Sequence, residues 1–275
     1  MRLLVADIGN TNTGIGLFAD GRLEGAWSAE TDVRATDDEL AAMVAGLLAL
    51  DGHRLEGLTA AAIACVVPPL VPGWRRMLGR RTGLEPLVLD AAALEGVLAV
   101  EIDRPAEAGA DRLANALAAR EEVGGPAIVV DLGTSTNFDV VSAEGAYLGG
   151  AIAPGLGVSV EALVGRAARL PRIELRRPPR AIGRNTVHAM QSGTVNGYIG
   201  LLSGLLAALR GELIERSPAG ARITVIATGG FSLEPWLADV PGIDRVEPEL
   251  TLRGIRYAHE RVTARTAART TRTHP

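Results

Sequence analysis

The sequence predicts an α/β protein built from two similar mixed sheets, each flanked by helices. Two observations lead to this prediction. Glycine-containing turns at residues 7–13 (DIGNTNT) and 131–137 (DLGTSTN) each lie between two apolar runs, one turn in each half of the chain. The apolar runs and helical patterns that follow the first turn recur in the same order after the second. A duplicated fold accounts for both observations.

The first half predicts the element order βββαβαβ. The strands are expected at residues 3–7, 14–18, 23–28, 61–67 and 86–89, and the helices at 36–48 and 74–82. Thr36 and Glu39 have the spacing of a capping box, which marks the start of the first helix. This order is typical of a ribonuclease-H-like fold, a mixed sheet with helices on both faces.

The second half repeats the pattern. Its strands are expected at residues 127–131, 138–142, 146–153 and 222–228, and its helices at 158–168 and 187–210, after an alanine-rich connecting helix at 113–122. The segment 261–275 consists mostly of Thr, Arg and Ala, which predicts disorder. We therefore expect domains at 1–118 and 119–260 and a disordered tail at 261–275.

Composition indicates a folded protein with an aliphatic core. Apolar residues make up 47% of the 275 residues, aromatic residues only 3% and charged residues 22%. The net charge of −4, without a basic face in the sequence, argues against nucleic acid as a partner. The lone Cys65 excludes an internal disulfide and fits a reducing compartment.

We expect a cytoplasmic protein that does not enter a membrane. Asp7 interrupts the first apolar run, so the N-terminus lacks the pattern of a signal peptide. We also expect no apolar stretch that approaches the roughly 20 residues of a membrane-spanning helix.

The two glycine turns have the residue types that bind phosphate. Glycine lets the backbone approach a ligand closely, and backbone N–H groups and threonine hydroxyls donate to phosphate oxygens. An aspartate at the start of each turn, Asp7 or Asp131, can hold a cation or the water molecules around it. Two such turns in one chain predict a nucleotide-binding cleft between the two halves.

Several motifs in order resemble the type III pantothenate kinases of bacteria, members of the superfamily that contains actin and the acetate and sugar kinases. The resemblance covers about residues 1–257. Its motifs are DIGNT (7–11), GADR (109–112), DLGTST (131–136), GGAIAPG (149–155), IGRNT (182–186), MQSG (190–193), TGG (228–230) and PELTL (248–252). The resemblance implies a duplicated ribonuclease-H-like, actin-like fold and ATP-dependent phosphorylation of pantothenate to 4'-phosphopantothenate, the first step of coenzyme A biosynthesis. It also implies a homodimer with the pantothenate site at its interface.

The resemblance assigns roles to individual residues. ATP would be bound by Asp7, Ile8, Gly9, Asn10, Thr11, Asn12, Thr13, Gly14 and Thr134, and pantothenate by Gly109, Ala110, Asp111, Arg112 and Thr186. Asp7 would hold Mg²⁺ through ATP, and Asp131 a monovalent cation, K⁺ or NH₄⁺, although an aspartate beside hydroxyls can equally hold Mg²⁺. Asp111 would accept the proton of the substrate hydroxyl. The TGG turn would bind adenosine.

Simpler structural roles are open for two of these residues. Asp111 and Thr186 each lie where a helix is expected to begin, so both can be N-caps. A helix N-terminus also favours an ionised carboxylate, which would make Asp111 a weaker base.

Three positions depart from the family pattern: Ile102, Asn137 and Asn196. The first and last leave the pantothenate pocket open to another shape. The alternatives are therefore a kinase of the same fold for another small alcohol, and a non-catalytic regulatory accessory factor. The first turn contains no lysine, so ATP binding should depend on backbone groups and a cation and be weak.

Overall fold

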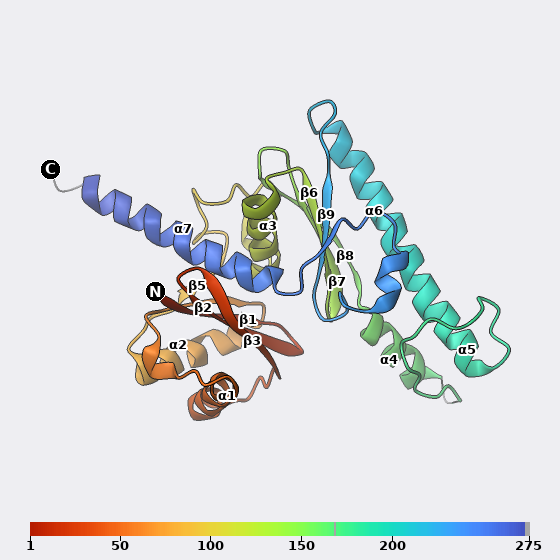
Figure 1. Cartoon of the computed structure of the whole chain (residues 1–275), viewed down its shortest axis with the longest axis horizontal. Coiled ribbons are helices and arrows are strands. Elements are labelled where there is room, and N and C mark those ends of the chain that lie inside the picture. The colour runs from red at the N-terminus through yellow and green to blue at the C-terminus, as the bar shows by residue number, and fades with distance from the viewer. Residues whose placement is uncertain (168, 273–275) are drawn as a thin grey trace. The chain divides into compact units, whose positions relative to one another are not determined.

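The computed structural model describes residues 1–167 and 169–272, with side chains as far as residue 268. The chain divides into two compact units (Figure 1). Unit 1 comprises Met1–Glu121 and Glu249–Pro275, and unit 2 comprises Glu122–Pro248. Each unit contains one five-stranded sheet. The first boundary therefore lies three residues beyond the predicted one, and the segment from Glu249 belongs to unit 1 rather than to the second domain.

Sheet A of unit 1 has the order β3-β2-β1-β4-β5. Its strands are β1 (Arg2–Ile8), β2 (Asn12–Ala19), β3 (Arg22–Glu30), β4 (Ala60–Cys65) and β5 (Leu87–Val88). The helices are α1 (Asp37–Leu50), α2 (Val71–Thr82), α3 (Ala110–Val123, whose last two residues lie in unit 2) and α7 (Leu250–Arg272). The first three strands are antiparallel, whereas β4 runs parallel to β1 and β5 parallel to β4.

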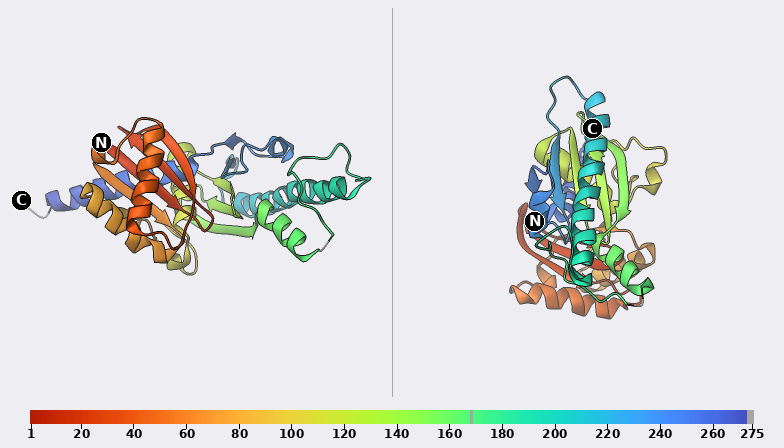
Figure 2. Two further views of the ribbon diagram at one scale, coloured as in Figure 1. Left: turned by 90° about the horizontal axis from the view of Figure 1, so that it is seen from below. Right: turned by 90° about the vertical axis from the view of Figure 1, so that its right-hand side faces the viewer.

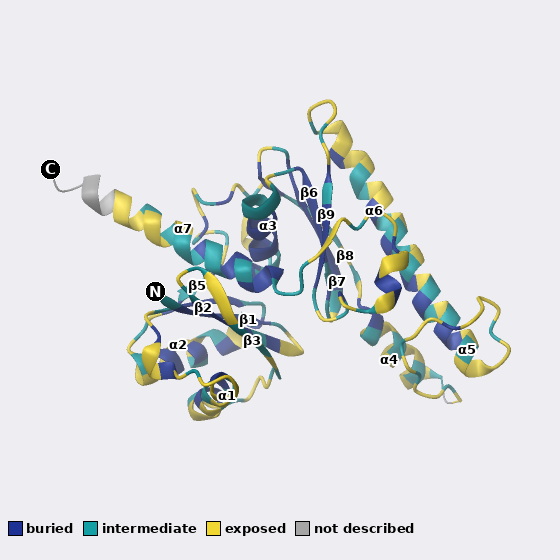
Figure 3. Cartoon of the chain, in the orientation of Figure 1, coloured by how far each residue is buried: buried dark blue, intermediate teal, exposed yellow. Residues whose placement is uncertain are grey.

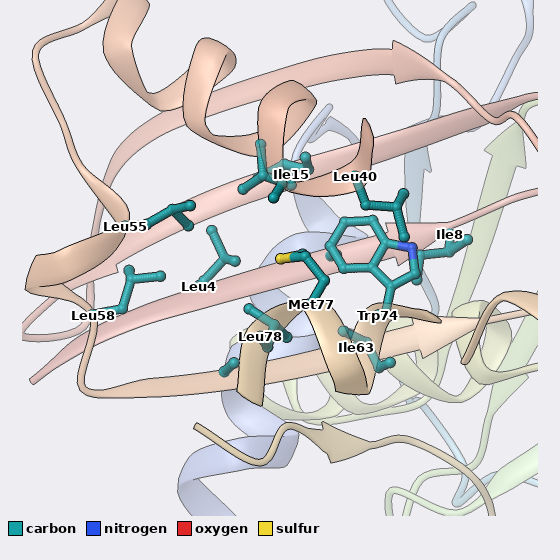
Figure 4. Packing of buried hydrophobic residues seen from close by; sticks show 14 of the residues in the cluster. Leu4, Ile8, Ile15, Leu40, Leu55, Leu58, Ile63, Trp74, Met77 and Leu78 are labelled. Carbon is teal, nitrogen blue, oxygen red and sulfur yellow. The ribbon is translucent and has the colours of Figure 1, made fainter. Parts of the chain in front are cut away.

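Successive side chains of β1 point to opposite faces of sheet A, and the apolar ones on each face are covered by helices. Leu4 and Ile8 pack with α1 and α2 in a core that contains Trp74 (Figure 4). A Cβ atom at Gly16 of β2 would meet both the intervening Val5 and Leu252, so Val5 faces the opposite layer. There α7 lies against β1, β2 and β4 (Figure 2). The predicted capping box is confirmed, since the side chains and backbone N–H groups of Thr36 and Glu39 bond reciprocally at the start of α1.

The prediction of a disordered tail is wrong for residues 261–272, which continue α7. The reason is packing that composition does not reveal. A Cβ atom at Gly254 would overlap the backbone of Ala114, so α7 and α3 are in close contact, and Thr251 donates a hydrogen bond to Asn115 (2.8 Å). Arg261 then forms an ion pair with Glu121. Residues 273–275 lie outside the described residues.

Sheet B of unit 2 has the order β10-β9-β6-β7-β8. Its strands are β6 (Ala127–Leu132), β7 (Ser135–Val141), β8 (Tyr147–Pro154), β9 (Thr224–Thr228) and β10 (Arg245–Val246), and its helices α4 (Leu156–Arg166), α5 (Thr186–Gln191) and α6 (Gly197–Glu215). Strand directions match those of sheet A position by position. The predicted duplication and the mixed sheets are therefore confirmed.

The long helix expected at 187–210 is interrupted by a π-helical turn, Ser192–Asn196, between α5 and α6. Leu202 and Leu206 of α6 pack against sheet B, whereas much of the opposite helix surface is intermediate or exposed (Figure 3). By length and composition the helical stretch Thr186–Glu215 could cross a membrane, and only 22% of its most apolar window is buried. The expectation that the chain holds no apolar stretch of that length is therefore wrong.

Candidate active site

The first glycine turn joins β1 to β2 at one edge of sheet A. Gly9 donates its backbone N–H to the carbonyl oxygen of Asn12 (3.0 Å), which closes the turn. A Cβ atom at residue 9 would lie 2.9 Å from that oxygen. Any residue other than glycine would therefore force the turn to shift. Asn10, Thr11 and Asn12 are exposed. The turn thus exposes the kind of backbone and polar side chains that bind a phosphate group.

Thr13 supports this turn from beneath. Its side chain is only 3% exposed, and its hydroxyl oxygen lies 2.8 Å from that of Thr31. Thr31 also donates its backbone N–H to the carbonyl oxygen of Thr11 (2.8 Å). The hydroxyl of Thr13 is therefore already engaged in holding the shape of the turn.

The Gly109–Arg112 motif lies at the same edge of sheet A. Strand β4 ends beside β1, where Val66 donates its backbone N–H to the carbonyl oxygen of Ile8 (3.0 Å). A Cβ atom at Gly109 would lie 3.6 Å from Cγ1 of Val66, so the start of α3 is next to these strand ends. Because β1 and β4 are parallel, their carboxyl ends bring the first turn and Asp111 to one edge.

Asp111 is a half-buried carboxyl in the first turn of α3. Its Oδ1 accepts the backbone N–H of Arg112 (2.8 Å). Burial raises the pKa of Asp111 above its ordinary value, and the hydrogen bond and charge of Arg112 oppose this shift without cancelling it. The residue is therefore a stronger base than a surface aspartate.

One expectation about Asp111 is wrong. It is not the N-cap of α3, because the helix starts at Ala110 and the carbonyl of Gly109 accepts the N–H of Leu113 (3.0 Å). Backbone N–H groups at the helix start lower the pKa of the carboxyl, as expected, but desolvation raises it by more.

The second glycine turn joins β6 to β7 in sheet B. Gly133 donates its N–H to the carbonyl oxygen of Ser135 (3.0 Å), and Gly155 donates to that of Thr134 (3.2 Å). A Cβ atom at Gly155 would overlap that threonine carbonyl. The segment before α4 therefore lies directly against the turn that contains Thr134.

Asp131 faces the TGG turn. Thr228 at the end of β9 is in register with Asp131 on β6. The next residue, Gly229, has φ +88°, and a Cβ atom there would lie 2.5 Å from Oδ1 of Asp131 and 2.7 Å from the N atom of Leu132. The TGG turn is thus packed directly against the Asp131 carboxylate, at a distance that only glycine allows.

We expect Gly229→Ala to lower the free energy of unfolding by about 1–3 kcal/mol, because the alanine must adopt a left-handed conformation. The new methyl group also meets the Asp131 carboxylate. Thermal denaturation measures the effect. Gly230→Ala is the matched control, since nothing lies within 4 Å of a Cβ atom there. Equal melting temperatures for both variants would contradict the described turn.

Sequence reasoning missed one contact of the second turn. The hydroxyl oxygens of Thr136 and Tyr198 are 2.6 Å apart, and Thr136 also donates to the carbonyl of Pro154 (3.2 Å). Burial raises the pKa of Tyr198, its hydrogen bond with Thr136 lowers it, and the charge of Asp131 raises it. The signal in the sequence is a tyrosine at the start of a mostly apolar helix.

Thr186 begins α5, and Asn185 rather than Thr186 is the N-cap, because its side chain accepts the N–H of His188 (2.8 Å). Thr186 lines a cavity of about 720 Å³ in unit 2. The wall is mostly apolar and includes Leu156, Val160, Leu163, Met190, Tyr198 and Leu201. The N-cap explanation of Thr186 is therefore wrong, and the residue is placed on a pocket.

The three departures from the family pattern have different surroundings. Ile102 is half-buried in unit 1. Asn137 accepts the hydroxyl of Ser135 (3.1 Å) in the second turn. Asn196 lies in the π turn, where its amide donates to Ser192 (3.0 Å).

The structure thus brings the predicted residues together in three groups. Unit 1 joins the Asp7 turn to Gly109–Arg112. In unit 2, Asp131 and Thr134 belong to the second glycine turn, where Asp131 lies beside the TGG turn, and Thr186 lies on the cavity. Among the described residues, no three His, Cys, Asp or Glu side chains cluster as metal ligands. A divalent ion would therefore take most of its ligands from substrate phosphates and water, as Mg²⁺ does.

Comparison with known proteins identifies the family. The model of the type III pantothenate kinase family matches residues 3–208. The chain is 45% identical over 258 residues to a type III pantothenate kinase of Roseiflexus sp. (strain RS-1), covering 94% of this chain and 98% of that protein. It is 46% identical over 262 residues to one of Thermomicrobium roseum, covering 94% and 97%.

A solved structure shares the fold. A Campylobacter jejuni protein described as a conserved Baf family transcriptional activator superposes with a TM-score of 0.54 at 19% identity, covering 94% of this chain and 97% of that one. The family model and the relatives show that the chain belongs to the type III pantothenate kinase family.

Proposed function

We propose that Asp111 is the residue through which this kinase activates pantothenate. The family reaction transfers the γ-phosphoryl group of ATP to the primary hydroxyl of pantothenate and begins coenzyme A biosynthesis. The carrying observation is the half-buried Asp111 carboxyl, with a raised pKa, at the sheet edge that holds the first glycine turn. The hydroxyl oxygen forms the new bond to phosphorus, its proton passes to Asp111, and ADP leaves.

ATP phosphates would be bound by residues 7–14 and by Thr134. The glycine-closed backbone of the first turn and the exposed side chains of residues 10–12 support this assignment. Asp7 would hold Mg²⁺ together with ATP; the ion supplies neutralisation of phosphate charge. The absence of a three-ligand cluster in the described residues fits an ion that arrives with its nucleotide.

Asp131 would hold a monovalent cation, K⁺ or NH₄⁺, whose charge would assist ATP binding. The position of the Asp131 carboxylate at the second glycine turn, beside the TGG turn, supports this role. Carboxylate and backbone oxygens are suitable ligands for such a hard cation.

Pantothenate would be bound by Gly109, Ala110, Arg112 and Thr186. The guanidinium of Arg112 suits the substrate carboxylate, because its N–H groups can form two parallel hydrogen bonds. Thr186 offers a hydroxyl at the wall of a mainly apolar cavity. An acyl amide with a polar acid end and an apolar body fits this combination.

We propose a homodimer formed through α6, with a second copy as the occupant of its exposed face. Five small residues of α6 are spaced alternately by three and four positions, and all are exposed: Gly197, Gly200, Gly204, Ala207 and Gly211. Such a seven-residue repeat lets two helices pack closely along their length. Only 22% of the most apolar window of the helical stretch Thr186–Glu215 is buried, which supports a protein partner on its exposed side. A dimer of this kind would work in the cytoplasm.

Release of ADP with pantothenate and Mg²⁺-ATP tests the proposal. We expect turnover in K⁺ that falls strongly when Na⁺ replaces it, and an apparent ATP constant in the millimolar range. The physical reason is that the first turn lacks a lysine and relies on backbone groups and cations. A coupled ADP assay over both salts and a range of ATP concentrations provides the measurement.

Three outcomes of this assay count against parts of the proposal. Equal rates in K⁺ and Na⁺ would remove the monovalent site, and a micromolar ATP constant would contradict the weak-binding argument. Turnover of another small alcohol but not pantothenate would change the substrate. No turnover with any cation would favour a regulatory accessory role.

A further inference from the structure

A pair of buried hydroxyls connects the second glycine turn to α6. Thr136 is fully buried, Tyr198 is 5% exposed, and their oxygen atoms are 2.6 Å apart. Tyr198 is also positioned by its ring, which packs edge-on against Trp236 at 5.5 Å between centroids. Its hydroxyl therefore has little freedom to move away from the turn.

The hydrogen atoms can be assigned from the partners. Thr136 has a single hydroxyl proton, which it donates to the carbonyl oxygen of Pro154 (3.2 Å), a group that can only accept. The phenol of Tyr198 must then donate to Thr136. Thr136 is thus held from two sides, by β8 and by α6, at the start of β7.

The helix segment that carries Tyr198 also carries a predicted substrate residue. Thr186 begins α5, Tyr198 follows the π turn, and both line the cavity of about 720 Å³. The extra residue of a π turn rotates the helix after it by about 100° relative to an uninterrupted α-helix, and such turns are frequent at functional sites. Tyr198 thereby lines the cavity and bonds to the second turn at once.

We propose that Tyr198 is a positioning residue that holds the second glycine turn, through Thr136, in the shape that binds ATP phosphate and the monovalent cation. The inference rests on the proposed function of Thr134 and Asp131. Thr136 lies two residues beyond Thr134 and pairs with Leu132, the residue after Asp131. Loss of the phenol hydroxyl would therefore loosen both ligand groups without removing either.

Tyr198→Phe and Thr136→Val test this role, alone and combined. Tyr147→Phe is the matched control, because Tyr147 is equally buried on the same sheet and donates to Asp139 (3.3 Å), away from the turn. Thermal-shift titrations with Mg²⁺-ATP, each in K⁺ and in Na⁺, report binding without requiring turnover. The ADP assay with pantothenate is run beside them.

We expect Tyr198→Phe to raise the half-saturating concentrations of Mg²⁺-ATP and K⁺ about five- to tenfold, the effect of one buried hydrogen bond, and Thr136→Val at least as much, because it also loses the bond to Pro154. The kcat at saturation of Tyr198→Phe should stay within about twofold. The double variant should resemble Thr136→Val, because removal of the threonine hydroxyl already removes the bond to Tyr198. Tyr147→Phe should titrate like the parent protein.

The proposal is overturned if Tyr198→Phe has the same half-saturating concentrations of Mg²⁺-ATP and K⁺ as the parent protein. It is also overturned if the fold-change of the double variant equals the product of the fold-changes of the two single variants. An equal shift in Tyr147→Phe also overturns it, because the cause would then be general loosening of unit 2. If the parent binds Mg²⁺-ATP but does not phosphorylate pantothenate, the proposed substrate fails while the titrations still decide the role of Tyr198.

Discussion

Asp111→Asn is expected to lower kcat/KM for pantothenate by about a thousandfold, within the range seen when a general base is removed. The amide keeps the shape of the side chain but cannot accept the proton of the attacking hydroxyl. ADP release under saturating K⁺ and Mg²⁺-ATP measures the loss. Asp103→Asn, at an exposed position in the same unit, is the control and should retain activity.

The pH dependence of the parent enzyme should report the same carboxyl. Because burial raises the pKa of Asp111, the rate should fall on acidification at a higher pH than an ordinary aspartate would give. The base is active only when ionised, so activity is lost as the pH falls through this pKa. The acidic limb should vanish from the residual activity of Asp111→Asn.

The stability of the fold should depend on pH in the opposite sense to the activity. With a raised pKa the folded protein binds more protons than the unfolded chain, so the contribution of Asp111 to stability is present at low pH and is lost as the pH rises through the folded pKa. At neutral pH the buried charge therefore opposes folding. Asp111→Asn should melt at the same temperature as the parent or higher, and a clearly lower melting temperature would indicate a structural role instead.

Gly204→Leu is expected to convert the proposed dimer to monomers and to lower turnover by about a hundredfold or more. Leucine on this face keeps two helices from approaching, and the pantothenate site is expected at the interface. Light scattering gives the mass, and the ADP assay gives the rate. Gly46→Leu is the matched control, since Gly46 is an exposed glycine in α1 with nothing within 4 Å of a Cβ atom.

A mixing experiment separates dimerisation from folding. If the site combines residues of two copies, co-refolded Asp111→Asn and Thr186→Val proteins should regain activity that neither has alone. A monomeric Gly204→Leu protein with full turnover would contradict the interface, and so would a dimer that is unchanged by this substitution.

Local pattern was enough to predict most of the fold and the residues of both turns. Strand alternation, the Thr36–Glu39 capping box and the glycine turns depend on near neighbours in sequence, so their physical causes are visible in short windows. The same holds for the duplication, since repeated short-range patterns gave the same strand order twice. The motifs added the family and its expected site residues.

Tertiary structure alone decided three other properties. The helix from Leu250 packs in unit 1 because Gly254 admits the backbone of Ala114, a contact between residues far apart in sequence. The raised pKa of Asp111 follows mainly from desolvation, which depends on what surrounds the carboxyl in the folded chain. Tyr198 meets Thr136 across 62 residues. Sequence thus determined the local turns and the family. Burial and long-range contacts, which arise only when the chain is folded, determined the packing of the last helix, the pKa of Asp111 and the partner of Tyr198.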